Sequence, residues 1–144
     1  MKIENYTFKV SIKKDVYRIV ELKGSSSLYK FASEILKAFN FDLDHCFCFY
    51  QDKKGINAYN SPELYELFVD MPECEPTNEQ AKGVKKTKIK SAFTAGKKMI
   101  FYFDYGDEWV FHVECLKISH EEPIYKLPKL LEKKGRAPKQ YPNY

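Results

Sequence analysis

Acidic and histidine side chains gather at two points where the chain is expected to reverse direction. One group follows a predicted helix, and the other surrounds Gly106. If these loops meet at one end of a sheet, two carboxylates and an imidazole can bind a divalent cation or serve as base and acid. With a metal-bound water as nucleophile, the chemistry would be hydrolysis. The residues concerned are Asp42, Asp44, His45, Asp104, Asp107 and His112.

The same residue types also have a purely structural explanation. Asp104 and Asp107 flank a turn glycine, where aspartate is favoured because its side chain bonds nearby backbone amides. Asp42 and Asp44 follow a helix end in a similar setting, and His45 can hold a loop through one hydrogen bond. This explanation is the stronger one. We therefore assign no catalytic residue and no metal ligand, and keep these side chains as candidate binding residues.

Trp109 directly follows the turn around Gly106. We expect its ring to anchor the core with the indole N–H hydrogen-bonded, and a place on a binding surface is the alternative. Other aromatic residues alternate along the same hairpin and should divide between the core and the outer face of the sheet. An outer face that is aromatic and basic can stack unpaired bases.

Basic residues are clustered in two stretches. The net charge of +4 permits attraction to nucleic acid without requiring it. Lys85, Lys86 and Lys88 are candidate phosphate contacts, although lysine runs also occur as solvated loops. The full clusters are Lys82, Lys85, Lys86, Lys88 and Lys90, and then Lys129, Lys133, Lys134, Arg136 and Lys139.

The four cysteines do not form a metal-binding motif. They contain no C-x-x-C pair and have no histidine at zinc-finger spacing, so no structural zinc and no cofactor is predicted. Cys46 and Cys48 alternate in an apolar segment and are expected to face one side of a strand as small buried hydrophobes. A redox role is the alternative.

The composition indicates one globular domain spanning residues 1–144. The chain is 44% hydrophobic and 31% charged, and it is long enough to bury a core without disulfides. Its longest apolar runs are too short to cross a bilayer, and the N-terminus lacks the apolar core of a signal peptide. We therefore expect a cytoplasmic protein that does not contact membranes.

The first half of the chain has three clear elements. Thr7–Ile12 and Val16–Leu22 are rich in β-branched and aromatic residues and predict a hairpin. Apolar residues from Leu28 to Phe39 recur at helical spacing, with Ser25–Ser27 as N-cap candidates and Asn40 as a left-handed C-terminal residue. One amphipathic helix should therefore cross the hairpin.

The second half reads as further strands joined by loops. A strand is predicted at His45–Gln51, and a short helix is predicted to begin at Ser61-Pro62-Glu63. A long loop follows from Pro72 to Lys88. A final hairpin joins Met99–Tyr105 to Glu108–Ile118, with Gly106 supplying a positive φ.

These elements predict an α+β fold. The sheet should be antiparallel or mixed and built from hairpins, with one crossing helix and a ββαβ start. Four prolines between Pro123 and Tyr144 indicate an irregular C-terminal tail with at most a turn near Leu130.

Several segments together resemble the Ri-plasmid ORF-three-like family, and the resemblance covers most of the chain. They are Val16–Ile19, Phe39–His45, Tyr102–Trp109 and Gly135–Tyr141. The resemblance implies a bacterial or archaeal domain of unsettled function, and recombinase labels on some relatives imply a link to mobile elements. The chain departs from the family at Tyr17, usually tryptophan, and at Asn40, usually glycine. Its Pro138–Tyr141 ending also replaces acids found in the family.

Two functions from different classes fit this sequence. The leading hypothesis is a small non-enzymatic module that binds protein or nucleic acid through the aromatic sheet face, the basic loop, or both. The alternative is a metal-dependent hydrolase or nuclease that uses the acidic and histidine residues. Catalysis requires those side chains to converge on one accessible point, whereas the binding module requires aspartates bonded within turns and an uninterrupted surface patch.

Overall fold

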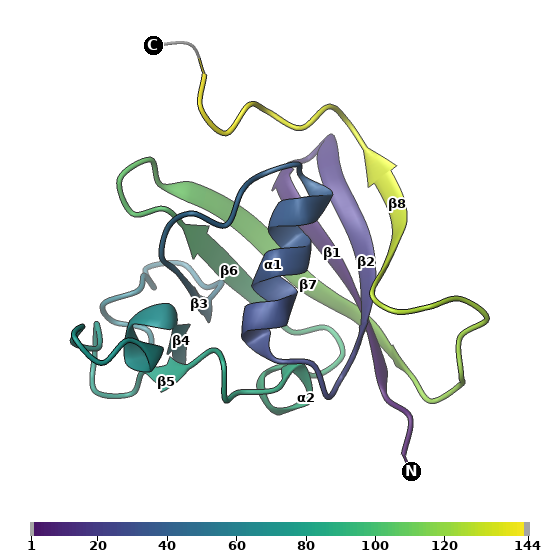
Figure 1. Ribbon diagram of the computed structural model, residues 1–144, viewed down its shortest axis with the longest axis horizontal. Coiled ribbons are helices and arrows are strands. Elements are labelled where there is room, and N and C mark those ends of the chain that lie inside the picture. Colours follow the sequence, from purple (N-terminus) through teal and green to yellow (C-terminus); the bar gives the residue numbers. More distant parts are fainter. Residues whose placement is uncertain (1, 143–144) are drawn as a thin grey trace.

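The computed structural model describes residues 2–142 and contains one mixed sheet of eight strands. The strand order is β5-β4-β3-β6-β7-β1-β2-β8, and α1 lies across one face (Figure 1). The strands are β1 (Asn5–Lys13), β2 (Val16–Lys23), β3 (Phe47–Gln51), β4 (Leu64–Glu66), β5 (Lys82–Gly83), β6 (Lys98–Phe103), β7 (Trp109–Ser119) and β8 (Lys129–Lys134). The helices are α1 (Leu28–Ala38), the 3₁₀ turn η1 (Leu67–Asp70) and α2 (Ile89–Ala92).

The predicted α+β class is confirmed. Every pairing in the sheet is antiparallel except that between β4 and β5. Both predicted hairpins are present, β1 with β2 and β6 with β7. No helix among residues 2–142 is long and apolar enough to span a membrane.

The crossing helix forms for the reasons that the sequence indicates. The Ser27 hydroxyl caps α1 by accepting a hydrogen bond from the Lys30 amide at 3.0 Å. Beyond its last turn, Asn40 takes a left-handed conformation with φ of 62°. The apolar stripe of α1 is fully buried against the sheet, so tertiary packing stabilises the helix as well as its caps.

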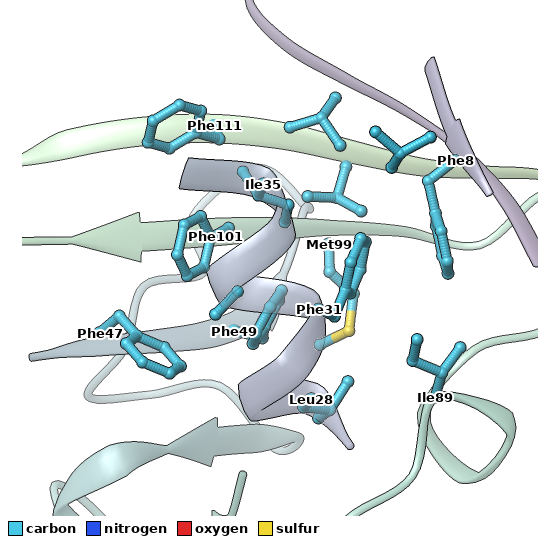
Figure 2. Packing of buried hydrophobic residues seen from close by; sticks show 14 of the residues in the cluster. Phe8, Leu28, Phe31, Ile35, Phe47, Phe49, Ile89, Met99, Phe101 and Phe111 are labelled. Atoms are coloured by element: carbon cyan, nitrogen blue, oxygen red, sulfur yellow. The ribbon is translucent and has the colours of Figure 1, made fainter. Parts of the chain in front are cut away.

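Phenylalanine rings fill the space between α1 and the inner face of the sheet (Figure 2). The Phe31 ring of α1 lies 4.2 Å from Phe8 of β1 and 5.7 Å from Phe49 of β3, measured between centroids. Phe101 of β6 continues the layer at 4.9 Å from Phe49. Each ring buried in this way stabilises the fold by about 1.5–3 kcal/mol relative to an exposed one.

The prediction of a short helix beginning at Ser61 is wrong. The Ser61 hydroxyl accepts a hydrogen bond from the Gln51 amide and donates to the Glu63 carbonyl, so it ties the segment to β3 and does not cap a helix. Leu64–Glu66 then pairs with β3 as β4. Only the following turn, η1, is helical. Pairing with β3 outweighs the local helix-start signal and makes residues 64–66 a strand.

The prediction that Gly106 supplies the positive φ of the β6–β7 turn is also wrong. Asp104 and Glu108 take the left-handed conformation, with φ of 64° and 56°. Aspartate tolerates this conformation because its carboxylate can bond the backbone that follows, and Asp104 Oδ1 accepts from the Gly106 and Asp107 amides at 3.1 and 3.2 Å.

The C-terminal tail is not wholly irregular as predicted. Lys129–Lys134 forms β8 and pairs with β2, because the prolines at 128 and 138 flank this stretch and leave its amides available. All residues of β8 are exposed, so the strand is held mainly by its backbone hydrogen bonds. The tail prediction extended to Tyr144, and residues 143–144 lie outside the described part.

The buried Arg18 of β2 links the end of α1 to the end of β8. Its Nε donates to the Ala38 carbonyl at 2.9 Å, and one terminal nitrogen donates to the Lys134 and Gly135 carbonyls at 2.9 and 3.1 Å. The guanidinium also lies 4.8 Å from the centroid of the Phe39 ring. The chain at residue 38 and the chain at residues 134–135 are therefore held by the same side chain.

Gly135 gives a test of how tightly the chain is held after β8. Gly135 and Gly55 both have left-handed φ, of 79° and 82°, but a Cβ at Gly135 would collide with the Asp15 carbonyl oxygen, whereas a Cβ at Gly55 would meet nothing. We expect Gly55→Ala to cost about 1–2 kcal/mol from φ alone. We expect Gly135→Ala to cost about 1–3 kcal/mol more, since the backbone must also shift. Urea unfolding measures both; equal losses would contradict the packing seen here.

Candidate functional site

The candidate site lies at one end of the sheet, where the start of β3 meets the end of β6. The two strands are paired, with Phe47 opposite Phe103. The pairing continues outward, because the Asp104 amide donates to the Cys46 carbonyl at 2.9 Å. This backbone contact places the Asp44–His45 loop beside the β6–β7 turn, as the sequence hypothesis required.

His45 is the centre of the cluster. Its Nδ1 lies 2.8 Å from Asp44 Oδ1 and 3.5 Å from Asp104 Oδ2. The hydrogen bond to Asp44 raises the pKa of His45, partial burial opposes the shift, and the negative charges of Asp104, Asp44 and Asp107 add to it. The imidazolium form is therefore stabilised in the folded chain.

Asp44 receives most of the hydrogen bonds in the cluster. Its Oδ2 accepts from the Tyr141 hydroxyl at 2.6 Å, and its Oδ1 accepts from the side-chain Nε2 of Gln140 at 3.1 Å. Burial alone would raise its pKa, but the bonds from Tyr141 and His45 outweigh this and lower the pKa of Asp44. The hydrogen bond to Asp44 raises the pKa of the Tyr141 hydroxyl, and burial raises it further.

Asp104 and Asp107 have different places in the cluster. The Asp104 side chain is buried, and its Oδ1 is bound to the turn amides, so only Oδ2 faces His45. Asp107 acts on His45 and Tyr141 through its charge. The structure therefore brings together four of the predicted residues: Asp44, His45, Asp104 and Asp107.

Asp42 and Trp109 border this cluster, and the side chain of neither forms a hydrogen bond within it. Asp42 is bound through its backbone, whose amide donates to Gln140 at 2.7 Å. The Trp109 ring packs on Phe41 at 4.8 Å as a partly buried anchor. The expectation that its N–H is hydrogen-bonded is wrong: Nε1 is buried and has no partner among residues 2–142. The ring is placed by apolar packing, which does not require that bond.

A model of the plasmid pRiA4b ORF-3-like protein family matches residues 4–140. The chain belongs to this family. The fold resembles the crystal structure of a protein of unknown function from Methanosarcina mazei Go1, with a TM-score of 0.72 and 19% sequence identity over 95% of this chain and 72% of that one. No curated protein matched.

His112 does not belong with the other acids and histidines of this ORF-3-like chain. It projects from β7 on the outer face of the sheet, where Nδ1 lies 3.3 Å from Asp52 Oδ2. Alternation along a strand explains the separation, because Phe111 and Val113 on either side of it enter the core. His112 lines a shallow pocket of about 240 Å³ together with Lys9, Ser11, Asp52, Lys98, Val113 and Glu114.

Lys85, Lys86 and Lys88 lie in a different part of the molecule, between β5 and α2. All are exposed. Lys85 Nζ lies 5.2 Å from the centroid of the Tyr29 ring on α1. The sequence-predicted binding residues thus occupy three separate surfaces: the His45 cluster, the outer face around His112, and the lysine segment.

Gln140 and Tyr141 are further members of the His45 cluster, and they were not predicted from the sequence. Gln140 bonds both backbone groups of Asp42 as well as the Asp44 carboxylate. Both side chains reach the cluster because β8 and Arg18 direct the tail back over the end of α1, as the ribbon shows (Figure 1). No local pattern signals such a contact. The only available sign was the unusual Pro138–Tyr141 ending.

The arrangement favours a proton on His45, which lies among hydrogen-bonded carboxylates. Both oxygens of Asp44 and one oxygen of Asp104 already accept hydrogen bonds from the protein. Among residues 2–142, no group of three or more His, Cys, Asp and Glu side chains is arranged to hold a metal. The cluster therefore acts chemically as a hydrogen-bonded clamp between the loop after α1 and the tail.

The clamp makes the titration of His45 a direct test of this geometry. We expect the pKa of His45, measured by NMR of the imidazole ring, to lie above 6.5 and to fall in Asp44→Asn, which removes its main partner. Asp42→Asn is the matched control, because it removes an acid two residues before Asp44 whose side chain has no bond to His45. A pKa that falls equally in both variants would contradict the direct contact.

The raised pKa of His45 also determines the direction in which the free energy of unfolding changes with pH. The contribution of His45 is fully present below its unfolded-state pKa near 6.5 and is lost as the pH rises through the folded-state value. Chemical denaturation of the native chain between pH 6 and pH 9 should therefore show a decline that His45→Gln lacks. A parallel decline in both would show that the clamp does not affect stability.

Proposed function

We propose that this ORF-3-like chain is a non-enzymatic module that binds nucleic acid through the segment from β5 to α2, which we call the lysine segment (residues 82–90). The observation that carries the proposal is a row of exposed lysines without ion-pair partners, beside one carboxylate, Asp70, whose Oδ2 accepts hydrogen bonds from the Val84 and Lys85 amides. The five lysines of the segment are exposed, and none takes part in a salt bridge within residues 2–142. They are Lys82, Lys85, Lys86, Lys88 and Lys90.

The lysine segment is fixed to the body of the protein. Val84 and Ile89 are fully buried between the lysines. Backbone hydrogen bonds join it to the start of α1: the Leu28 amide donates to the Thr87 carbonyl at 2.9 Å, and the Ile89 amide donates to the Ser26 carbonyl at 2.8 Å. Because the backbone is already ordered, a polyanion would pay little entropy for ordering it on binding.

The chemistry of this surface favours contact with phosphates over recognition of bases. The Tyr29 ring, the aromatic residue beside the lysines, is half-buried and already lies against Lys85 and Phe47. Stacking on an unpaired base requires a free ring face. Ammonium groups on flexible stems bind phosphate as point charges, so the expected binding depends strongly on salt and weakly on base sequence.

The other two surfaces are less suited to a polyanion. The pocket around His112 carries Lys9 and Lys98 but also Asp52 and Glu114, so charges of both signs face the solvent. The His45 cluster carries the negative charges of Asp44, Asp104 and Asp107 around one imidazole. Like charge would repel phosphate from this end of the sheet.

Binding to a single-stranded oligonucleotide tests the proposal. We expect fluorescence anisotropy to show binding whose logarithmic salt slope falls by about 2 in Lys85→Ala/Lys86→Ala/Lys88→Ala, since each lost phosphate contact removes about 0.7. Lys13→Ala/Lys14→Ala/Lys54→Ala removes the same charge at exposed positions outside the lysine segment and is the matched control. An unchanged slope in the first variant, or an equal fall in both, would overturn the proposal.

The same oligonucleotide also tests the alternative hypothesis, a metal-dependent nuclease. The nearness of Asp44, His45 and Asp104 is the observation that favours it, although their bonds to protein donors speak against a metal there. We expect the oligonucleotide to remain intact during incubation with Mn²⁺. Cleavage that is lost in His45→Ala and retained in the lysine variant would favour the enzyme.

A further inference from the structure

The solvent-facing side of α1 carries charged side chains that the lysine segment does not include. Lys30, Glu34 and Lys37 recur at helical spacing, so they lie on one side of the helix. The Nζ atoms of Lys30 and Lys37 are 3.1 and 3.9 Å from Glu34 Oε1. Two ammonium groups share one carboxylate, so this side of α1 keeps a net positive charge.

The lysine segment adjoins the first turn of α1. Ser27, the N-cap residue, forms an isolated antiparallel bridge with Lys88. The Nζ atom of Lys85 lies over the Tyr29 ring, and Tyr29 directly precedes Lys30. The ammonium groups of the segment therefore lie beside those of α1.

Strand β8 lies beside α1 at the other end of the helix (Figure 1). A cavity of about 130 Å³ between them is lined by Lys37 of α1 and by Lys129 of β8. Lys133 is opposite Arg18, which bonds the end of α1, so the Lys133 side chain is on the face of the sheet that α1 covers. Neither lysine of β8 named here forms a salt bridge within residues 2–142.

We propose that a single strand of nucleic acid bound at the lysine segment continues along the exposed side of α1 to β8. We call this surface the α1 path, and its phosphate contacts are Lys30, Lys37 and Lys133. The inference rests on the proposed function, because the lysine segment supplies the first contacts. The 11 residues of α1 rise about 16 Å, so the bound strand extends several nucleotides beyond the segment. A flexible single strand can follow this surface, whereas duplex DNA is stiff over about 150 base pairs.

Glu34 provides the sharpest test, because its negative charge lies between Lys30 and Lys37. The probe is a thymidine oligonucleotide of about 16 nucleotides, the upper end of single-stranded site sizes. Glu34→Gln should tighten its binding by about two- to fivefold at low salt, the effect of one exposed charge contact. Glu114→Gln removes the same charge from the outer face of the sheet and is the matched control. Unfolding only weakens binding, so a gain reports the path itself.

A charge-removal variant tests the α1 path from the opposite direction. Lys30→Ala/Lys37→Ala/Lys133→Ala should lower the logarithmic salt slope by about 2, the effect of three lost phosphate contacts, while one oligonucleotide still binds per chain. The variant of the lysine segment described above is measured in parallel.

The outcomes separate the α1 path from the proposed function. If the slope falls in the lysine-segment variant and not in the α1 variant, the path is wrong and the proposed function stands. If it falls in neither, both are wrong, and a fall in the α1 variant alone keeps this surface and overturns the proposed function. Equal effects of Glu34→Gln and Glu114→Gln also overturn the path.

Discussion

The hydrogen bonds of Arg18 determine how the loop after α1 and the C-terminal tail meet at the His45 cluster. A buried guanidinium must satisfy its donors within the protein, and Arg18 does so with carbonyls at the end of α1 and the end of β8. These contacts set where the chain leaves α1 toward Asp44 and where the tail leaves β8 toward Tyr141. The clamp between Asp44, His45 and Tyr141 therefore depends on the hydrogen bonds that the Arg18 side chain makes with main-chain carbonyls.

Local chemistry was sufficient to predict the hairpins and α1. The alternation of Phe8 and Val10 and the helical spacing of Leu28, Phe31 and Ile35 report the burial of single faces, which depends on neighbours close in sequence. The strand at Leu64–Glu66 and the strand at Lys129–Lys134 were missed, because each exists only through pairing with a distant strand. Ser61-Pro62-Glu63, just before the first of these strands, has helix-start chemistry, and prolines at 128 and 138 flank the second.

Only part of the candidate site could be predicted, again because local sequence patterns do not show which distant segments meet. Asp44, His45 and Asp104 stand at the ends of strands that pair, so a sheet places them together once the pairing is known. The hypothesis that groups His112 with these residues is wrong. Side chains alternate along β7, and that of His112 lies on the outer face of the sheet. Gln140 and Tyr141 lie about a hundred residues from their partners and are brought there by tail geometry.

The position of β1 inside the sheet has a consequence for how the chain acquires its structure. β1 is formed by the first residues of the chain, yet its second neighbour is β7, and Phe8 is opposite Cys115. The β1–β2 hairpin and α1 can begin to form early, but one edge of β1 has no partner until β7 has been synthesised. Pairings over such separations make folding slow, and an open strand edge invites wrong partners. The nascent chain is therefore most vulnerable to misassembly before β6 and β7 emerge from the ribosome.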